Sequence, residues 1–329
     1  MIKSETPEVS VIIPNWNTLR WLPGCLDALN TQTFHDFHII IVDNGSTDDS
    51  VAFIQEHYPD VDVIVLPENR GFAVAVNTGI KASQSEYIVL LNVDTVPRPC
   101  WLEKLVETAE QNPPEIGFLA SKMLNLDNPD LIDDAGDSFS WYGSSWKRGK
   151  GEPAARYNQP DEVLSACAGA ALYRRTFFEA VGLFDEDFIS YLEDVDLGLR
   201  GQLLGYRCLY VPEAEVLHQG QGAGIPRPRY VTFSTRNRLM VLTKNIPLSL
   251  LLKHSYTLLF GQFYFFLVYK KPYYSLKGYA AFLRTLPATL RKRREILNSK
   301  KITKQAVDRL LTSDLNEPSL SKIFLSKLR

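Results

Sequence analysis

The sequence predicts an α/β fold in which helices flank an open sheet, and three observations support this prediction. Over the first hundred residues, short β-branched runs alternate with helical stretches, as parallel strands alternate with crossover helices. Polar loops follow successive strands, where open α/β sheets bind their ligands. The chain has 329 residues, 45% of them hydrophobic, which is enough to build a sizeable core. We therefore expect a folded protein with a binding site at one edge of its sheet.

The alternation can be followed element by element. The first predicted strand, residues 9–13, is closed by Pro14. Further strands are predicted over residues 37–42, 61–66 and 87–92, and helices over residues 19–31, 50–57 and 71–82. After residue 115 the pattern is less regular, and one more helix is predicted over residues 195–204.

Four polar loops follow the four predicted strands. They begin at Pro14, Asp43, Glu68 and Asn92. Because the carboxyl ends of parallel strands meet at one edge of the sheet, these loops are expected to converge. No G-x-G-x-x-G motif follows the first strand, which argues against a dinucleotide-dependent oxidoreductase.

Acidic residues stand out at two places. Residues 193–197 hold three carboxylates, those of Glu193, Asp194 and Asp196. Such neighbours repel one another, so they are typical of a metal site or a catalytic base; the alternative is a charged helix start, because acids favour the helix N-terminus. Asp94 ends a buried strand, where a divalent cation could use its carboxylate, or where it could cap the next helix. His218 is either a ligand or a structural histidine.

The net charge of −2 hides a division along the chain. Residues 244–329 carry 17 Lys and Arg against 4 Asp and Glu, a net charge of +13, whereas residues 1–243 carry 19 against 34, a net charge of −15. This asymmetry predicts an anionic partner for the C-terminal part, either a nucleic acid or a membrane surface.

The apolar content of the C-terminal part favours the membrane. Residues 255–269 are strongly aromatic and are flanked by Lys253, Lys270 and Lys271, and a basic cluster follows at residues 291–294. About 15 residues are too few to span a bilayer as a helix, which needs ~20. The segment suits an interfacial element on an anionic membrane, so we expect no nucleic acid partner. Two alternatives stay open: a buried helical hairpin and a dimer interface, so the oligomeric state is not predicted.

The four cysteines are far apart, form no C-x-x-C pair and follow no apolar leader segment. They predict a reducing compartment. Together with the basic C-terminal part, this places the expected protein in the cytoplasm, peripherally on the inner face of the cell membrane.

A resemblance becomes specific when six segments are taken in order. They are residues 9–17, 41–48, 68–77 and 90–95, the segment 191–197, and His218. Their order and residues resemble the family 2 glycosyltransferases, and the chain looks most like the bacterial rhamnosyltransferase-type branch. The resemblance covers roughly residues 8–240. It implies a GT-A type, Rossmann-like mixed sheet flanked by helices. Together with the charge division, it predicts a catalytic domain over residues 1–243 and a basic, aromatic helical extension over residues 244–329.

The resemblance also implies roles for individual residues. In it, Asp43 accepts a hydrogen bond from a pyrimidine base, and Arg70 suits the diphosphate because a guanidinium binds oxyanions with two hydrogen bonds. Asp94 and His218 hold a divalent metal, Mg or Mn, and Asp194 is the catalytic base with Glu193 beside it. Trp141, Arg236 and Asn237 are expected on the acceptor side; for the segment 235–238, salt bridges to the acidic domain are an equally good explanation. The residues implied to bind the nucleotide sugar are Pro14, Asn15, Asn17, Asp43, Asn69, Arg70, Gly71, Asn77, Asn92, Val93 and Asp94.

One position departs from the family pattern. The first acid of the D-x-D motif is Asn92 in this chain, so metal binding would rest on Asp94, the donor diphosphate, water and His218. The activity implied is inverting transfer of a sugar, with rhamnose favoured. Its donor is a dTDP or UDP sugar, and its acceptor is a glycan or polyprenyl-linked hydroxyl in cell-surface polysaccharide synthesis.

Three other classes of protein fit the sequence less well. A glycoside hydrolase needs two carboxylates on opposite sides of a sugar, which adjacent residues of one segment do not supply. A sugar-nucleotide nucleotidyltransferase usually has a glycine-rich, basic loop near its N-terminus, and residues 14–17 lack both features. A non-catalytic carbohydrate-binding protein would need no intact Asp194.

Overall fold

The computed structural model describes residues 6–220 and 226–316, so residues 317–329 of the predicted extension lie outside the described part. The chain divides into two compact units. The first comprises Met1–Asp137, Lys147–Gln202 and Tyr206–Gly224, and the second comprises Ser138–Trp146, Leu203–Gly205 and Ile225–Arg329.

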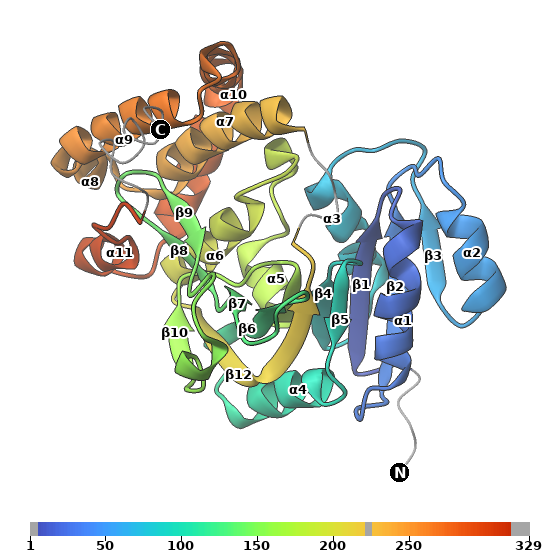
Figure 1. Ribbon diagram of the computed structural model, residues 1–329. Helices are drawn as coiled ribbons and strands as arrows, with labels where there is room; N and C mark the ends of the chain where they lie inside the picture. The colour runs from blue at the N-terminus through green and yellow to red at the C-terminus, as the bar shows by residue number, and fades with distance from the viewer. Residues whose placement is uncertain (1–5, 221–225, 317–329) are drawn as a thin grey trace. The chain divides into compact units, whose positions relative to one another are not determined.

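A ten-stranded mixed sheet forms the centre of the first unit (Figure 1). Its main path runs in the order β10-β12-β6-β11-β4-β1-β2-β3, with β5 paired to β12 and β7 paired to β6. The strands are β1 Val9–Asn15, β2 Phe37–Asp43, β3 Asp62–Val65, β4 Tyr87–Leu91, β5 Thr95–Pro97, β6 Ile116–Asn125, β7 Ile132–Asp134, β10 Asp161–Val163, β11 Ala170–Arg174 and β12 Arg207–His218. Two short strands, β8 Asp137–Phe139 and β9 Ser145–Lys147, form a separate two-stranded sheet, and most of their residues belong to the second unit.

The helices of the first unit cover both faces of its sheet. They are α1 Leu22–Asn30, α2 Ser50–His57, α3 Phe72–Ala82, α4 Trp101–Gln111, α5 Arg175–Val181 and α6 Glu193–Leu203, with short 3-10 helices at Leu19–Trp21, Ala154–Arg156 and Glu186–Phe188. The four strands and four helices predicted from the sequence are all present, with ends that differ by a few residues.

The first four strands are parallel, as their sequence pattern predicts. Strand β1 pairs in parallel with β2 and with β4, and β2 pairs in parallel with β3. The later strands add antiparallel pairs, such as β11 with β4 and with β6, so the complete sheet is mixed.

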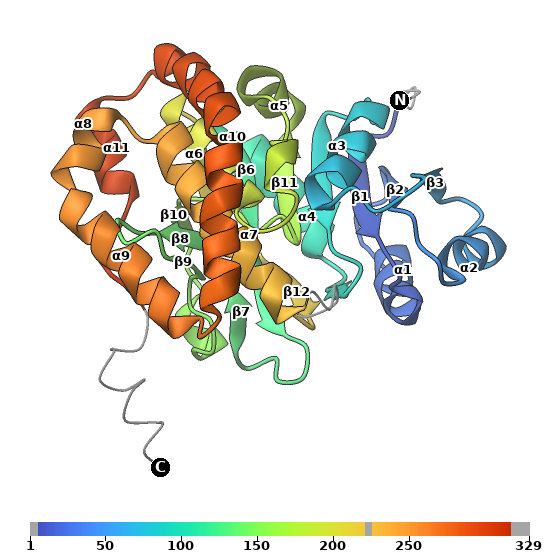
Figure 2. The same ribbon diagram turned by 90° about the horizontal axis from the view of Figure 1, so that it is seen from above.

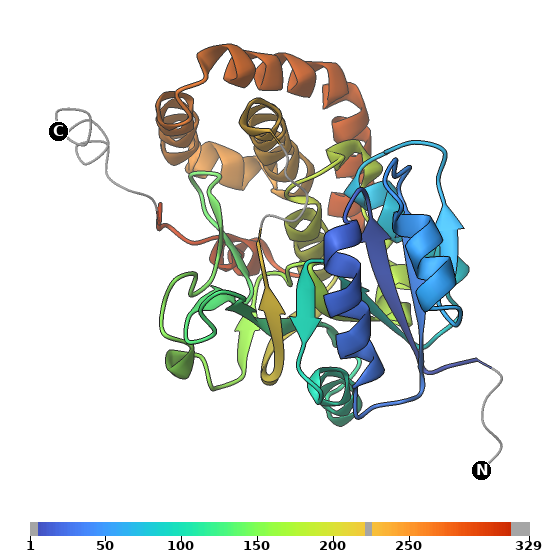
Figure 3. The same ribbon diagram turned by 45° about the vertical axis from the view of Figure 1, so that its right-hand side comes forward.

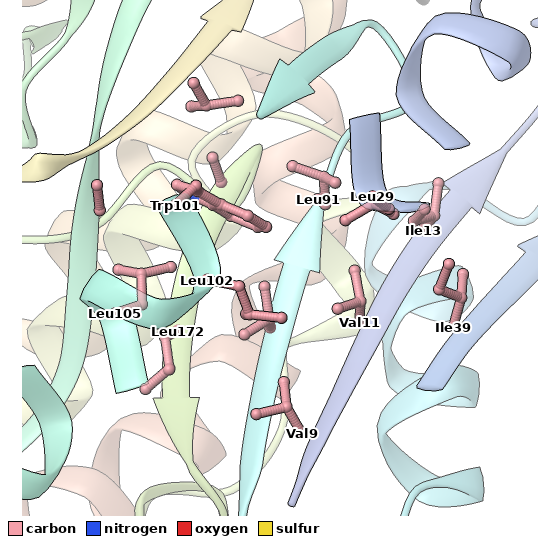
Figure 4. Close-up of a cluster of buried hydrophobic side chains, with 14 of the residues drawn as sticks. Val9, Val11, Ile13, Leu29, Ile39, Leu91, Trp101, Leu102, Leu105 and Leu172 are labelled. Atoms are coloured by element: carbon pink, nitrogen blue, oxygen red, sulfur yellow. The ribbon is translucent and has the colours of Figure 1, made fainter. Parts of the chain in front are cut away.

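Side chains of β1 alternate between two hydrophobic clusters because successive residues of a strand point to opposite faces. Val9, Val11 and Ile13 pack with α1 and α4 on one face (Figure 4), and Ile12 packs with α3 on the other. Figure 3 shows α1, in blue, in front of the first strands. A strand buried on both faces reads as a continuous apolar run, which is why it can be recognised in the sequence.

The second unit is largely helical. Its helices are α7 Arg227–Asn245, α8 Leu248–Lys253, α9 Ser255–Val268, α10 Pro272–Ser299 and α11 Lys304–Leu310. The long helix α10 runs beside α7 (Figure 2), and Gly278 permits a close approach: a Cβ atom there would lie 2.7 Å from the carbonyl oxygen of Thr232. Within the described ranges, none of the helices combines the length and the apolar character that crossing a bilayer requires.

Candidate active site

The loops after β1 and β2 are joined by hydrogen bonds between their polar side chains. Asn15 follows Pro14 at the end of β1 and donates to Oδ2 of Asp43 over 2.7 Å, and Oδ1 of Asp43 accepts from the backbone N–H of Ser46 over 2.9 Å. Oδ1 of Asn17 accepts from the backbone N–H of Thr47 over 2.7 Å. The parallel register of β1 and β2, which sets Asn15 opposite Asp43, produces this meeting. The first two predicted loops therefore form one polar edge.

Asn44 extends this edge to the third loop. Its side-chain oxygen accepts from the backbone N–H of Arg70 over 2.9 Å, and its nitrogen donates to the oxygen of Asn69 over 3.2 Å and to the carbonyl of Gly71 over 3.1 Å. The guanidinium-bearing residue Arg70 is exposed. Asn44 was not predicted as a site residue, although it lies next to Asp43.

Gly71 joins the third loop to the acidic segment. It has a φ of +92°, and a Cβ atom there would lie 2.6 Å from the carbonyl oxygen of Ile189, so only glycine fits this contact. The next residue, Phe72, donates its N–H to the same carbonyl over 2.9 Å. Ile189, Tyr191 and Leu192 all have positive φ values, a strained backbone for such residues. This strained turn leads directly into Glu193 and Asp194.

The three carboxylates of the acidic segment have different surroundings. Asp196 is fully buried and pairs with Arg200, whose Nε lies 3.0 Å from it and whose other nitrogens donate to the carbonyls of Val181 and Leu183. This network holds α6 in place, so Asp196 has a structural role. Asp194 is partly exposed and accepts from the backbone N–H of Val195 over 2.8 Å.

Burial changes the acidity of the other two carboxyls. It raises the pKa of Asp194, and the backbone hydrogen bonds that favour the ionised form do not cancel this effect. Burial and the adjacent charge of Asp194 raise the pKa of Glu193 to about 8. At neutral pH Glu193 is therefore mostly protonated.

Asp94 and His218 are brought together by strand pairing. Strand β5 begins directly after Asp94 and pairs with the end of β12, so that Thr95 lies opposite His218. The backbone N–H of Gln219 also donates to the carbonyl of Asp94 over 3.0 Å. As a result Nε2 of His218 lies 3.6 Å from Oδ2 of Asp94, and both side chains are buried.

Asp133 holds the other ring nitrogen of His218. Its Oδ2 lies 2.7 Å from Nδ1 of His218 and 2.6 Å from Nζ of Lys147. Burial alone would raise the pKa of Asp133, but His218 and Lys147 hold it well below its usual range. Burial would lower the pKa of His218, whereas Asp133 and Asp94 more than offset this and raise it. The ionised Asp133 therefore orients the ring so that Nε2 points to Asp94.

Comparison with known proteins decides the family. The family model described as "Glycosyl transferase family 2" matches residues 10–182, which is more than half of the chain. The chain belongs to glycosyl transferase family 2. This membership classes it as a glycosyltransferase enzyme and confirms the resemblance seen in the sequence motifs.

Two relatives indicate the branch of family 2. The chain is 30% identical over 217 residues to an N-acetylglucosaminyl-diphospho-decaprenol L-rhamnosyltransferase of Mycobacterium tuberculosis, covering 59% of this chain and 70% of that relative. It is 28% identical over 224 residues to the O-antigen biosynthesis protein RfbC of Myxococcus xanthus, covering 65% of this chain. The match spans 17% of the length of that second relative.

Solved structures of the same fold confirm the GT-A architecture expected for a family 2 transferase. GalNAc-T7, crystallised with UDP, GalNAc and Mn2+, superposes with a TM-score of 0.59 at 16% identity, covering 74% of this chain and 48% of that one. The mannosyltransferase PcManGT of Pyrobaculum calidifontis, in complex with GDP-Man and Mn2+, gives a TM-score of 0.50 at 16% identity, covering 90% and 86%.

The residues of this glycosyltransferase fit a divalent cation through two side chains. Among the described residues there is no group of three or more His, Cys, Asp and Glu side chains that could hold a metal. Asp94 and Nε2 of His218 offer an oxygen and a nitrogen ligand that face each other, and the Asp133 bond to Nδ1 is typical of metal-binding histidines. The remaining ligands would have to be diphosphate oxygens and water, as Asn92 in the D-x-D position already suggests.

Several predicted site residues have other partners in the transferase. Asn77 is buried, donates to the carbonyl of Phe184 over 2.9 Å and accepts from its N–H over 3.0 Å, so its amide joins α3 to that segment. Trp141 is buried in the second unit and stacks on His254 with ring centroids 3.8 Å apart. Arg236 and Asn237 are buried in α7, where Nε of Arg236 donates to Asn237 over 2.8 Å.

Val93 and Asn92 lie in the turn between β4 and β5. Val93 is buried in the hydrophobic cluster that contains α1 and α4, and the backbone N–H of Asn92 donates to the carbonyl of Gly169 over 2.8 Å. These contacts fix the backbone that carries Asp94.

Asp133 and Lys147 were not predicted as site residues from the sequence. One signal could have found Asp133: the adjacent acids Asp133 and Asp134 interrupt an otherwise apolar run at residues 131–135, where buried charges need partners. Nothing in the sequence near Lys147 indicates that it would be the partner, because that pairing depends on the fold.

The raised pKa of Glu193 predicts a pH-dependent stability. A carboxyl with a pKa of about 8 in the folded protein and an ordinary value of 4.5 holds its proton more tightly when folded. The contribution of this carboxyl to the free energy of unfolding is complete below pH 4.5. It is lost as the pH rises towards 8, at up to about 1.4 kcal/mol per pH unit. Glu193→Gln removes this dependence, so its stability relative to the wild type should rise between pH 5 and pH 8 by on the order of 1 to 3 kcal/mol.

Urea unfolding of both proteins at the two pH values measures this difference. The exposed Glu179 on α5 provides the control, because Glu179→Gln makes the same chemical change and should leave the pH dependence of the wild type intact. An identical pH dependence in the wild type and Glu193→Gln would contradict the protonated state of Glu193.

Proposed function

We propose that the protein transfers a sugar from a nucleoside-diphosphate sugar to a hydroxyl group of a glycan or lipid-linked oligosaccharide in cell-surface polysaccharide synthesis. The observation that carries the proposal is the buried Asp94–His218 pair, which lies in the same unit as the carboxylate of Asp194. Rhamnose, from a dTDP or UDP donor, is the proposed sugar because the mycobacterial relative at 30% identity is named a rhamnosyltransferase.

The proposed reaction is a single displacement. Asp194 accepts the proton of the acceptor hydroxyl, and the acceptor oxygen forms a bond to C1 of the sugar from the face opposite the diphosphate. The bond between C1 and the diphosphate oxygen breaks, and its electron pair leaves with the nucleoside diphosphate. The configuration at C1 is inverted and no covalent enzyme intermediate forms.

The raised pKa of Asp194 suits this role because a more basic carboxylate accepts a proton more readily. The adjacent Glu193 has a pKa of about 8, so it stays protonated at neutral pH and can donate a hydrogen bond to the acceptor or donor. In this proposal Asp194 is the base and Glu193 is a hydrogen-bond donor.

The donor is proposed to bind at the polar edge formed by the strand-end loops. Asp43 and Asn15 would bind the base and ribose, and the exposed Arg70 would bind the diphosphate. Asp94 and His218 would hold Mg or Mn at the diphosphate, and the cation would neutralise the charge that develops on the leaving group. Asn17, Asn69 and Gly71 would shape the edge through the hydrogen bonds described above, and Trp141, Arg236 and Asn237 remain proposed for the acceptor side.

The proposed acceptor places the enzyme at a membrane. A polyprenyl-linked acceptor is supported by the name of the mycobacterial relative, which includes diphospho-decaprenol. A cytoplasmic enzyme bound peripherally to the inner face of the cell membrane would meet both its soluble donor and this acceptor.

A transfer assay tests the proposal. The protein is incubated with a labelled nucleotide sugar and an N-acetylglucosaminyl-diphospho-polyprenol, and both phases are analysed after extraction with organic solvent. We expect label in the lipid product, an equal amount of nucleoside diphosphate, and an inverted anomeric configuration by NMR. Release of pyrophosphate would instead identify a nucleotidyltransferase, and sugar binding without turnover would identify a carbohydrate-binding protein.

The contact between Asp133 and His218 gives a further prediction. Asp133→Asn removes the negative charge that fixes the ring of His218, so Mn2+ affinity in the presence of nucleoside diphosphate should fall about 10-fold to 100-fold. Electron paramagnetic resonance of free Mn2+ measures this affinity without turnover. Asp130→Asn, at an exposed position before β7, should bind Mn2+ as the wild type does. Equal affinity in both variants would show that Asp133 does not act through His218.

A further inference from the structure

Large apolar side chains are exposed mainly on three successive helices of the second unit. Among the described residues, eleven large hydrophobic side chains are exposed, and nine of these lie between residues 248 and 290. The nine, which we call the outward face, are Leu248, Leu252, Tyr256, Leu259, Phe263, Tyr273, Leu276, Leu283 and Leu290. Their exposed fractions range from 41% to 83%, so each of these side chains is clearly exposed to solvent.

The spacing of the outward face follows helix geometry. On α8 and α9 its members recur at intervals of three or four residues from Leu248 to Phe263, and on α10 Leu276, Leu283 and Leu290 are seven residues apart. Residues at these intervals lie on one side of a helix. Each stretch therefore presents an apolar stripe rather than scattered residues.

The opposite sides of the same helices are already covered. Tyr264 and Phe265 of α9 are buried in a cluster with Val231 of α7, and the guanidinium of Arg238 lies 3.6 Å above the Phe265 ring. Gly278 of α10 packs against Thr232 and Thr235 of α7. The second unit thus has its own hydrophobic core, and the side chains of the outward face are not part of that core.

Basic side chains accompany the stripe on α10. Lys277, Arg284 and Arg291 directly follow Leu276, Leu283 and Leu290, and all three are exposed. The sequence contains no Asp or Glu between Glu215 and Glu295. Not all of the basic residues of the unit are available, because Lys253 pairs with Asp308 and Arg293 donates to the carbonyl of Thr243.

We infer that the outward face of α8, α9 and α10 is a docking surface for an anionic lipid membrane. Apolar side chains at the level of the acyl chains, beside Lys and Arg at the level of the phosphates, are the chemistry of an interfacial helix. The helices lie on the bilayer surface, since none of the described helices can cross it. This inference rests on the proposed function for its purpose, because the surface would hold the enzyme where a lipid-linked acceptor is found.

Charge argues against a second copy of the chain as the occupant. A two-fold symmetric dimer places the same patch of both subunits face to face. The cations of α10 would then oppose one another, and α10 carries a single carboxylate, Glu295 near its end, to compensate them. Anionic head groups supply the missing negative charge.

Vesicle sedimentation tests the surface directly. The full chain is mixed with phosphatidylcholine vesicles containing about one third phosphatidylglycerol, and with pure phosphatidylcholine vesicles. We expect binding to the anionic vesicles that weakens with salt, and at least about 10-fold weaker binding to the neutral ones. Two triple variants, Leu276→Ser/Leu283→Ser/Leu290→Ser and Lys277→Gln/Arg284→Gln/Arg291→Gln, should each lose about 10-fold or more in affinity.

A matched control separates this surface from net charge. The variant Lys301→Gln/Lys304→Gln/Arg309→Gln also removes three positive charges, at exposed positions outside the outward face. It should bind vesicles like the wild type. Thermal unfolding shows that each variant is folded. Wild-type binding by either test variant, equal loss in the control, or failure of the wild type to bind anionic vesicles would overturn the inference. So would a wild-type dimer that the leucine variant converts to a monomer.

The vesicle assay does not depend on sugar transfer. If vesicle binding fails while transfer to a water-soluble acceptor is observed, only the docking surface is wrong. If binding occurs as expected and no transfer is found with any donor, only the proposed function is wrong.

Discussion

Replacing Asp194 with Asn is expected to reduce sugar transfer by about 100-fold to 10,000-fold, the range for loss of a general base. The amide keeps the size of the carboxyl group and its hydrogen bond from Val195, but it cannot accept the proton of the acceptor hydroxyl. Donor affinity should change little, because the proposed role of Asp194 is on the acceptor. Calorimetric binding of the donor and steady-state transfer rates measure the two effects separately.

The control for this variant is Glu179→Gln, an equivalent change at an exposed position of α5, which should leave both quantities unchanged. The raised pKa of Asp194 adds a second observable. Since the base must be ionised, kcat/KM should fall as the pH drops through its folded pKa, at a higher pH than for an ordinary aspartate. Full turnover by Asp194→Asn would remove Asp194 from the mechanism.

Replacing Asp94 or His218 with Ala is expected to weaken binding of the donor by about 10-fold to 100-fold, the effect of losing a charge-assisted contact. Both side chains would act on the diphosphate through one cation. The double variant should therefore lose less than the sum of the two single losses in free energy. Donor affinities measured at limiting and saturating Mn give both the size of the loss and its dependence on metal.

Asp127→Ala and His35→Ala make the same chemical changes at exposed positions and should bind the donor normally. Unchanged donor affinity in Asp94→Ala and His218→Ala, at every metal concentration, would count against the assignment of both ligands.

Much of the parallel part of the fold could be predicted because strands such as β1 and β4 are buried on both faces. Val9, Val11, Ile12 and Ile13 all enter a core, so β1 appears in the sequence as an apolar run that is interrupted by Ser10 and stops at a proline. The polar loops that follow such strands were predictable for the same reason, and the register of β1 with β2 does join Asn15 to Asp43.

The rest of the site depends on pairing between distant segments. His218 meets Asp94 because β12 pairs with the three-residue strand β5, which is too short to give a periodic signal. Asp133 reaches His218 from β7, another three-residue strand. Local patterns do not encode these long-range pairings. The family resemblance indicated Asp94 and His218 as site residues. Neither it nor a local pattern indicated Asp133, the carboxylate that orients His218.

The surroundings of the acidic segment were also beyond sequence reasoning. The order of residues could not show that Asp196 would form an ion pair with Arg200, or that burial would raise the pKa of Glu193. Likewise, Lys253 seemed available to a membrane in the sequence, whereas the fold pairs it with Asp308. The partners of a charge are set by packing.

The most direct test of the proposed chemistry is a donor panel. The protein is incubated separately with dTDP-rhamnose, UDP-hexoses and UDP-N-acetylhexosamines, with and without Mn, and released nucleoside diphosphate is measured. We predict release from at least one donor, greatest with dTDP-rhamnose, stimulated by Mn and lost in Asp194→Asn. Absence of nucleoside diphosphate release from every donor, in the presence of Mn and a polyprenyl-linked acceptor, would contradict the proposal that this chain transfers sugar from a nucleotide.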